Sequence, residues 1–147
     1  MESFFENPKQ ALKIPLSLVP KCGPCGYHKG CKNPKQKVQG RGKRRILIIG
    51  DHPDEETDKT GGFFTRDEKL IVSRILDRNG INIDRDCWIT GSLICKPSGQ
   101  HDKRTATDFC RPNIMKLLQD LEPTVVILMG EYGIELIRYL WKDEGLS

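Results

Sequence analysis

The chain of 147 residues contains no apolar run that approaches the roughly 18 residues a membrane-spanning helix needs. Its first residues, MESFFENPKQ, are polar and acidic, and they lack the basic and then apolar order of a secretory signal. With 14 Gly and 9 Pro, the sequence is too poor in both for a collagen-like or disordered chain. These absences predict a globular, cytoplasmic protein with no membrane partner. We also expect the protein to be a monomer.

Opposite charges separate along the chain. Residues 1–45 contain 11 Lys and Arg against 2 acidic residues, whereas residues 46–147 contain 13 against 18. A basic segment on an acidic body predicts a polyanionic partner, and the alternative is a solvated tail. We divide one domain into an N-terminal extension (1–20), a basic arm (21–45) that a metal or cluster would have to order, and an α/β body (46–147).

Six cysteines are the unusual feature of the composition. In a chain without an export signal, a metal or cluster site is a better default than disulfides. Cys22 and Cys25 form a C-x2-C pair, Cys95 ends a predicted strand, and Cys110 is placed in the first turn of the following helix. Two local and two distant thiolates suit a 4Fe–4S cluster, but the spacing is equally compatible with zinc.

An alternative zinc site would use the arm alone. There, Cys22, Cys25, His28 and Cys31 run C-x2-C-x2-H-x2-C, which is tight for one tetrahedral ion. The remaining cysteine, Cys87, is predicted to pack in the sheet as a small hydrophobe.

The body alternates strand and helix patterns. Short apolar runs predict buried strands over residues 46–49, 87–95 and 124–129, while helical spacing predicts helices over 65–80, from about 107 to 121, and over 131–141. Thr65 and Glu68 fit a capping box at the first helix. The expected inward apolar residues of the first and third helices include Ile71, Ile75, Leu76 and Ile137. This order predicts a three-layer α/β/α fold with a central parallel sheet.

Two loops carry candidate chemistry. Gly50-Asp51-His52-Pro53-Asp54 follows the first strand, where open α/β sheets bind their ligands, and places a carboxylate beside an imidazole. The alternative is a solvated acidic turn. The second loop, Phe63-Phe64 after a double glycine, could bring an aromatic ring into a pocket, although one of the two rings is expected in the core.

Taken in order, these motifs resemble a known family. C-x2-C, a basic G-x-G linker, ILIIG-D-x-P, D-x-x-G-x-x-F, C-K-P, a helix-borne C-R-P and VVILMG are similar to motifs of the iron–sulfur (family four) uracil-DNA glycosylases, from about Lys21 to the last residue. The resemblance implies an α/β/α fold with four parallel strands, a 4Fe–4S cluster, and hydrolysis of the N-glycosidic bond of uracil in DNA. It also leads us to expect a shortened chain that lacks the final strand and its His-Pro-Ser loop.

By this resemblance the cluster ligands are Cys22, Cys25, Cys95 and Cys110. The loop between the last two departs from the family, because it reads Gln100-His101-Asp102-Lys103-Arg104-Thr105 in place of Asn-Arg-x-Pro-Thr.

The same resemblance assigns the catalytic and substrate-binding residues. Asp51 keeps the family's carboxylate, and His52, which replaces a small residue, is placed to position water. Phe64 matches the aromatic residue that stacks on the extruded base. Gly91 replaces the uracil-reading asparagine and so removes a hydrogen bond to the pyrimidine edge. The loop residues Gly50 and Pro53 complete the predicted substrate-binding set.

The predicted function is therefore a uracil-DNA glycosylase-like protein that binds single- or double-stranded DNA and a 4Fe–4S cluster, and that excises uracil or another base in base excision repair. The alternative is a non-catalytic, cluster-bearing nucleic-acid-binding module derived from that family, and a third is a zinc protein without DNA chemistry. Predicted contacts to DNA phosphates come from the basic arm: Lys29, Lys32, Lys35, Lys37, Arg41, Lys43, Arg44 and Arg45.

Overall fold

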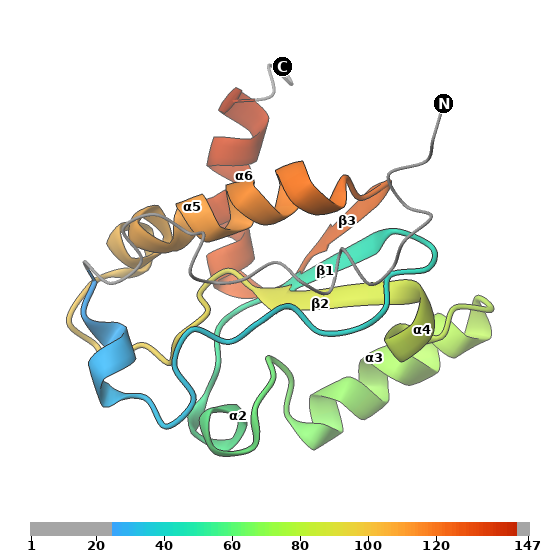
Figure 1. The fold of residues 1–147 in the computed structure, drawn as a ribbon, viewed down its shortest axis with the longest axis horizontal. Helices are drawn as coiled ribbons and strands as arrows, with labels where there is room; N and C mark the ends of the chain where they lie inside the picture. Colours follow the sequence, from blue (N-terminus) through green and yellow to red (C-terminus); the bar gives the residue numbers. More distant parts are fainter. Residues whose placement is uncertain (1–24, 144–147) are drawn as a thin grey trace.

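A parallel sheet forms the centre of the protein in the computed structural model, which describes residues 25–143 (Figure 1). Strand β1 (Ile46–Gly50) lies between β2 (Cys87–Gly91) and β3 (Val125–Leu128), and both neighbours run parallel to it. Every residue of β1 and β2 is buried, as expected for strands covered on both faces. The predicted α/β fold with a parallel sheet is confirmed.

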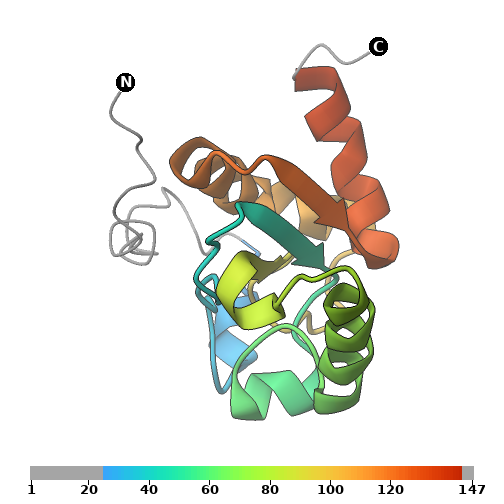
Figure 2. The same ribbon diagram turned by 90° about the vertical axis from the view of Figure 1, so that its right-hand side faces the viewer.

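Helices cover both faces of the sheet (Figure 2). In chain order the described helices are η2 (Tyr27–Gly30), α2 (Glu55–Thr60), α3 (Arg66–Arg78), α4 (Ile83–Asp86), α5 (Lys103–Leu121) and α6 (Gly130–Asp143). Because side chains alternate along a strand, Ile48 packs on the face that receives α3 and α4, whereas Leu47 packs on the face that receives α5 and α6. Within residues 25–143, no helix has the length and apolarity needed to cross a membrane.

The predicted boundaries of two elements are wrong. Strand β2 ends at Gly91 and not near Cys95, because the N–H groups of Ser92 and Leu93 turn back to the carbonyls of Gly50 and Asp51. Helix α5 begins at Lys103 and not near Thr107, because the Asp102 side chain caps it by accepting the N–H of Thr105 at 2.7 Å. Cys110 therefore lies beyond the first turn of α5.

The inward faces of two helices are also corrected. The capping box of Thr65 and Glu68 is present at α3, but Ile71 and Ile75 are exposed, and only Leu76 of the predicted set is buried. In α6, Ile137 is exposed and its neighbour Leu136 is fully buried. Each error is a rotation about the helix axis, which sequence spacing alone does not determine when apolar residues are adjacent.

The described part of the basic arm runs along the free side of β2 (Figure 1). Gln39 and Ile89 exchange two backbone hydrogen bonds of 2.9 and 2.8 Å, and the backbone N–H groups of residues 41–44 donate to carbonyls of residues 84–87. Gly42 allows this close approach, since a Cβ there would lie 1.9 Å from the Trp88 ring. Backbone pairing thus holds residues 36–44 onto the body.

Candidate functional site

Asp51 follows β1 directly and lies at the carboxyl edge of the sheet. Its Oδ1 accepts the backbone N–H of Tyr132 at 2.8 Å, and a Cβ placed on Gly130 would lie 2.4 Å from its carboxyl carbon. The carboxylate therefore lies against the first turn of α6, where unpaired N–H groups favour a negative charge. Asp51 joins β1 to α6, and position 130 must be glycine for it to do so.

His52 stands beside Asp51 and is half-buried. Its ring meets the ring of Tyr132 edge to face, with centroids 5.0 Å apart, and its Nδ1 lies 2.9 Å from the carbonyl oxygen of Pro53. A carbonyl only accepts hydrogen bonds, so this contact requires the proton on Nδ1 and leaves Nε2 as an acceptor in the neutral ring. The ring is thus held in a tautomer that can take a proton from water.

The two phenylalanines have different roles in the structure. Phe63 is buried, with 4% of its surface exposed, and belongs to the core. Phe64 is half-buried, and its ring lies over Gly50, where a Cβ would be only 3.3 Å from the ring. The prediction that one ring is core is confirmed. The aromatic surface at the carboxyl end of β1 belongs to Phe64.

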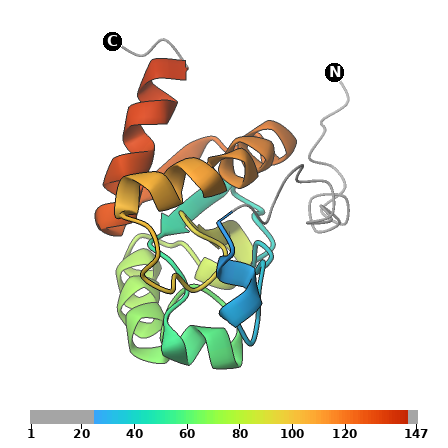
Figure 3. The same cartoon turned by 90° about the vertical axis from the view of Figure 1, so that its left-hand side faces the viewer.

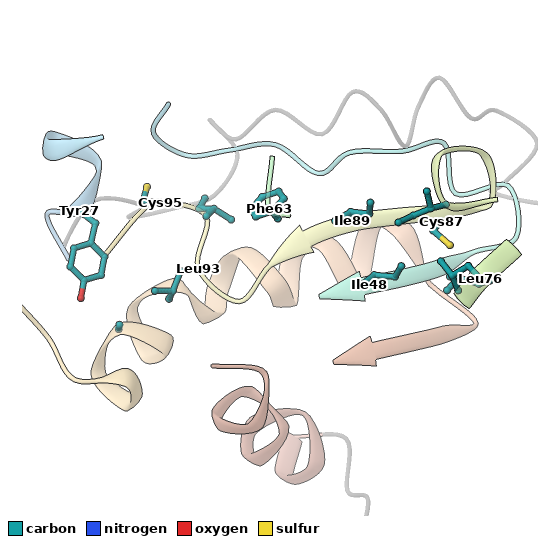
Figure 4. Packing of buried hydrophobic residues seen from close by; sticks show 12 residues of the cluster. Tyr27, Ile48, Phe63, Leu76, Cys87, Ile89, Leu93 and Cys95 are labelled. Atoms are coloured by element: carbon teal, nitrogen blue, oxygen red, sulfur yellow. The ribbon is translucent and has the colours of Figure 1, made fainter. Parts of the chain in front are cut away.

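Gly91 lies at the same edge, at the end of β2. A Cβ on Gly91 would lie 2.5 Å from the carbonyl oxygen of Leu93 and 2.7 Å from the Phe63 ring. The space that a longer residue would need is therefore filled, and position 91 offers only its backbone to a ligand. Figure 4 shows the Phe63 ring above the tip of β2.

Two acids of the run after this loop, Asp54 and Asp58, make contacts within the protein, whereas Glu55 and Glu56 are exposed. Asp54 caps α2 in a capping box with Thr57, and Pro53 is buried. Asp58 has only 2% of its surface exposed, and its carboxylate accepts the backbone N–H groups of Lys32 and Asn33, each at 3.0 Å. Burial raises the pKa of the Asp58 carboxyl, but these two hydrogen bonds and the positive charges of Lys96 and Lys32 together bring the pKa below its ordinary value. Asp58 thus fastens the arm to α2, next to η2 (Figure 3).

Three of the four predicted cluster ligands line one small cavity. Cys25 comes from the arm, Cys95 from the segment after β2, and Cys110 from α5, and the remaining walls are mostly apolar. Cys22 lies outside the described residues. Within residues 25–143, no three His, Cys, Asp or Glu side chains are close enough together to hold a single metal ion. Cys87 is elsewhere, at the far end of the core in Figure 4, where burial raises its thiol pKa to about 11.

An aromatic group that the sequence did not predict lies beside this cavity, and two of its members, Tyr27 and Phe109, line the cavity wall. The His101 ring lies between Tyr27 and Phe109, with centroid distances of 5.4 and 5.2 Å, and its Nε2 is 3.1 Å from the Cys25 carbonyl oxygen. We call Tyr27, His101 and Phe109 the aromatic clasp, since it joins the arm to α5. The only signal in the sequence was that His101 stands in a loop that departs from the family.

Polar groups also reach the sulfur atoms around the cavity. The backbone N–H of Lys35 donates to Cys95 Sγ at 3.2 Å, and the Asn113 side-chain amide donates to Cys110 Sγ at 3.4 Å. Cys31 is half-buried against the same apolar cluster, and its thiol donates to the Tyr27 carbonyl at 3.1 Å. Burial raises the pKa of this Cys31 thiol.

The predicted DNA-contacting residues are divided between two ends of the sheet. Lys29 and Lys32 are exposed in and after η2, near α2. At the opposite end, Arg44 donates to the Gly80 carbonyl, and Arg45, which precedes β1, donates to the Glu122 carbonyl. The arm therefore does not present its charges on one face.

Comparison with known proteins places these features in a family. The family model of the uracil DNA glycosylase superfamily matches residues 38–143 of the chain.

Two similar curated proteins are named type-4 uracil-DNA glycosylase. That of Thermotoga maritima is 27% identical over 128 residues, which cover 83% of this chain and 63% of that protein. That of Saccharolobus solfataricus is 26% identical over 131 residues, which cover 88% of this chain and 58% of that protein. The chain thus spans about three fifths of the length of these relatives. A shorter match, 36% identical over 64 residues, is to Holliday junction branch migration complex subunit RuvA of Brevibacillus brevis, and covers 44% of this chain and 31% of that subunit.

Proposed function

The chain belongs to the uracil DNA glycosylase superfamily, and on this premise we propose that it binds DNA and hydrolyses the N-glycosidic bond of uracil, or of another extruded base, in base excision repair. The observation that carries the proposal is the grouping of Asp51, His52 and Phe64 at the carboxyl edge of the sheet. There a carboxylate, an imidazole with Nε2 able to accept a proton, and an aromatic surface lie around the end of β1.

In the proposed reaction, the base leaves the DNA stack and lies on the Phe64 ring, because the bond is inaccessible within a duplex. Water forms a bond to the sugar carbon C1′ while the bond from C1′ to the base nitrogen breaks, and the base leaves with that electron pair. His52 Nε2 accepts the proton that the water loses and returns it to the departing base. Asp51, held by the N–H of Tyr132, places negative charge next to the cationic sugar.

We further propose that Cys25, Cys95 and Cys110, together with Cys22, hold a 4Fe–4S cluster. Three thiols on different walls of one mostly apolar cavity support this, since each iron of such a cluster takes one cysteine thiolate. The N–H groups from Lys35 and Asn113 that reach two of these sulfurs would stabilise thiolate charge. When bound, the cluster would join the arm, the segment after β2 and α5, and its role would be structural.

The cluster is tested on anaerobically purified protein. We expect brown protein with broad absorbance near 400 nm and about four irons per chain. Cys95→Ser and Cys110→Ser should lose most of the colour, whereas Cys87→Ser, outside the cavity, should keep it. His101→Ala opens the aromatic clasp and should speed bleaching in air. Colourless protein that contains one zinc would refute the cluster.

The activity is tested with uracil-containing single- and double-stranded oligonucleotides, by counting alkali-labile abasic sites. Phe64→Ala and His52→Ala should each lower the rate by a factor of ~100 or more, in the range typical of general-base and positioning groups. The control, Glu55→Gln, changes an exposed residue of α2 and should act as wild type.

A non-catalytic DNA-binding module is the second candidate, and one observation favours it. Position 91 has no side chain, and Phe63 and the Leu93 carbonyl fill the space around it, so no side chain there reads a pyrimidine edge. Protein that is loaded with cluster, binds DNA and produces no abasic sites would establish this candidate over the enzyme.

A further inference from the structure

We infer that the groove between the arm and the loop after α2 binds the phosphate backbone of a DNA strand that enters the candidate site. The groove is lined by residues 33–39 of the arm and by Gly61 and Gly62. This inference rests on the proposed function, since it takes DNA as the ligand. It assigns phosphate contacts to the part of the arm that contains Lys35 and Lys37, and not to the part near α4 that contains Arg41 and Lys43.

The charge of the groove is positive. Lys35 and Lys37 line it, and exposed Lys32 stands beside it. Among the described residues that line the groove, none is acidic. The Asp58 carboxylate, which accepts the N–H groups of Lys32 and of the groove residue Asn33, is buried.

The opposite wall lets a ligand come close to the backbone. Gly61 and Gly62 have φ of 86° and 107°, a region that favours glycine, and a Cβ on Gly61 would have no heavy atom within 4 Å. The N–H of Gly62 already donates to the Gln36 side chain. Gly61 and Gly62 therefore leave room for a phosphate group near the backbone, and Lys35 and Lys37 attract its negative charge.

The groove and the candidate site are adjacent, because Gly62 of the groove lies two residues before Phe64 of the site. Gly62 is followed by Phe63 and Phe64, and two residues of extended chain span at most about 7 Å. A base that stacks on Phe64 thus has its neighbouring phosphates within reach of the groove.

Arg41, Lys43 and Arg44 of the arm lie away from this path. The backbone N–H groups of Arg41 and Lys43 pair with the carbonyls of Asp84 and Arg85 in α4, which precedes the amino end of β2. The candidate site is at the carboxyl end of the same strand. A matched pair of charge removals can therefore distinguish the groove from a general effect of net charge.

The experiment measures binding of a short, fluorescein-labelled, uracil-containing single strand to the full chain by anisotropy across a salt series. Lys35→Gln/Lys37→Gln should weaken binding on the order of tenfold at physiological salt and lower the salt slope by about 1.4, the value for two phosphates of a single strand. Arg41→Gln/Lys43→Gln removes the same charge and should change affinity less than about twofold. Both double variants should keep the wild-type thermal midpoint.

The two possible failures are distinguishable. If wild-type protein binds DNA but the Lys35 and Lys37 pair leaves affinity and salt slope unchanged, or if both pairs weaken binding equally, the groove is overturned and the proposed function stands. If wild-type protein binds no DNA even at low salt, the proposed function is overturned together with the groove.

Discussion

Replacement of Asp58 by asparagine tests how the arm is fastened to α2. The carboxylate is 2% exposed and accepts two backbone N–H groups, from Lys32 and Asn33, at 3.0 Å each. Asparagine has almost the same shape but only one acceptor oxygen. Its amide NH2 would face one of the two N–H groups, so a donor would be left buried and unpaired.

The expected loss of stability follows from these contacts. A hydrogen bond to a charged group contributes about 1.5 to 3 kcal/mol, and a buried donor left unpaired costs about 1 to 3 kcal/mol. Since asparagine retains one of the two bonds in weakened form, we expect Asp58→Asn to lower the free energy of unfolding by about 3 kcal/mol. With a urea m value of about 2 kcal/mol/M, the midpoint should fall by about 1.5 M.

Urea unfolding followed by circular dichroism measures this difference, with Glu55→Gln as control. Glu55 is on the same helix, but its side chain is 81% exposed and lies 3.9 Å from Lys59, so its removal should cost less than about 0.5 kcal/mol. Because the Asp58 pKa is lowered in the fold, its contribution is present above the ordinary value of 3.8 and is lost as pH falls through the folded value. The gap between Asp58→Asn and wild type should therefore close in acid. A gap below about 0.5 kcal/mol at neutral pH would refute this account of the arm.

Three further predictions concern single residues. Gly42→Ala should lower the thermal midpoint by about 10 °C or more, because its Cβ would lie 1.9 Å from the Trp88 ring. The control is Gly80→Ala, which has a similar φ but open space around the Cβ, so it measures backbone strain alone and should lower the midpoint far less. Equal decreases for the two variants would contradict a clash with Trp88. The hydrogen bond from Arg85 lowers the Asp86 pKa to about 2, so wild-type stability should fall as pH drops from 3.8 toward 2, and Asp86→Asn should flatten that part of the acid unfolding curve. Gly130→Ala should displace the Asp51 carboxylate, and so lower abasic-site formation more than it lowers the thermal midpoint; unchanged activity would show that the α6 contact does not position Asp51.

Sequence patterns were sufficient for the sheet and for the family. Three short apolar runs predicted β1, β2 and β3, and a continuous apolar run correctly indicated that β1 and β2 are buried throughout. The prediction that β3 is also buried is wrong, because β3 lies at the edge of the described sheet, with Val125 and Val126 exposed and its other two residues half-buried. The capping box at Thr65 was also correct, since its reciprocal hydrogen bonds are local. Motif order identified the superfamily, which the match over residues 38–143 confirms. The 4Fe–4S cluster, the monomeric state and the cytoplasmic location stay predictions.

Only the tertiary structure determines which residues each side chain contacts. The sequence places Asp58 among several acidic residues and so predicts a solvated turn, but in the fold Asp58 is buried against Lys32 and Asn33. His101 has no helical or strand pattern, and its place between Tyr27 and Phe109 depends on segments far apart in the chain. Phe63 and Phe64 are identical in type and adjacent, but opposite side-chain directions bury one and place the other over Gly50.

The sequence also did not determine where the basic side chains of the arm lie in space. The composition places 11 of the 24 Lys and Arg before residue 46, and so determines that this segment is basic and that a polyanion is a plausible partner. The path of the arm along β2 then separates those charges, because backbone pairing near α4 holds one part at the amino end of the strand and Asp58 holds the other near α2. Local spacing determined the elements and the motifs, whereas long-range contacts determined which residues meet at the site.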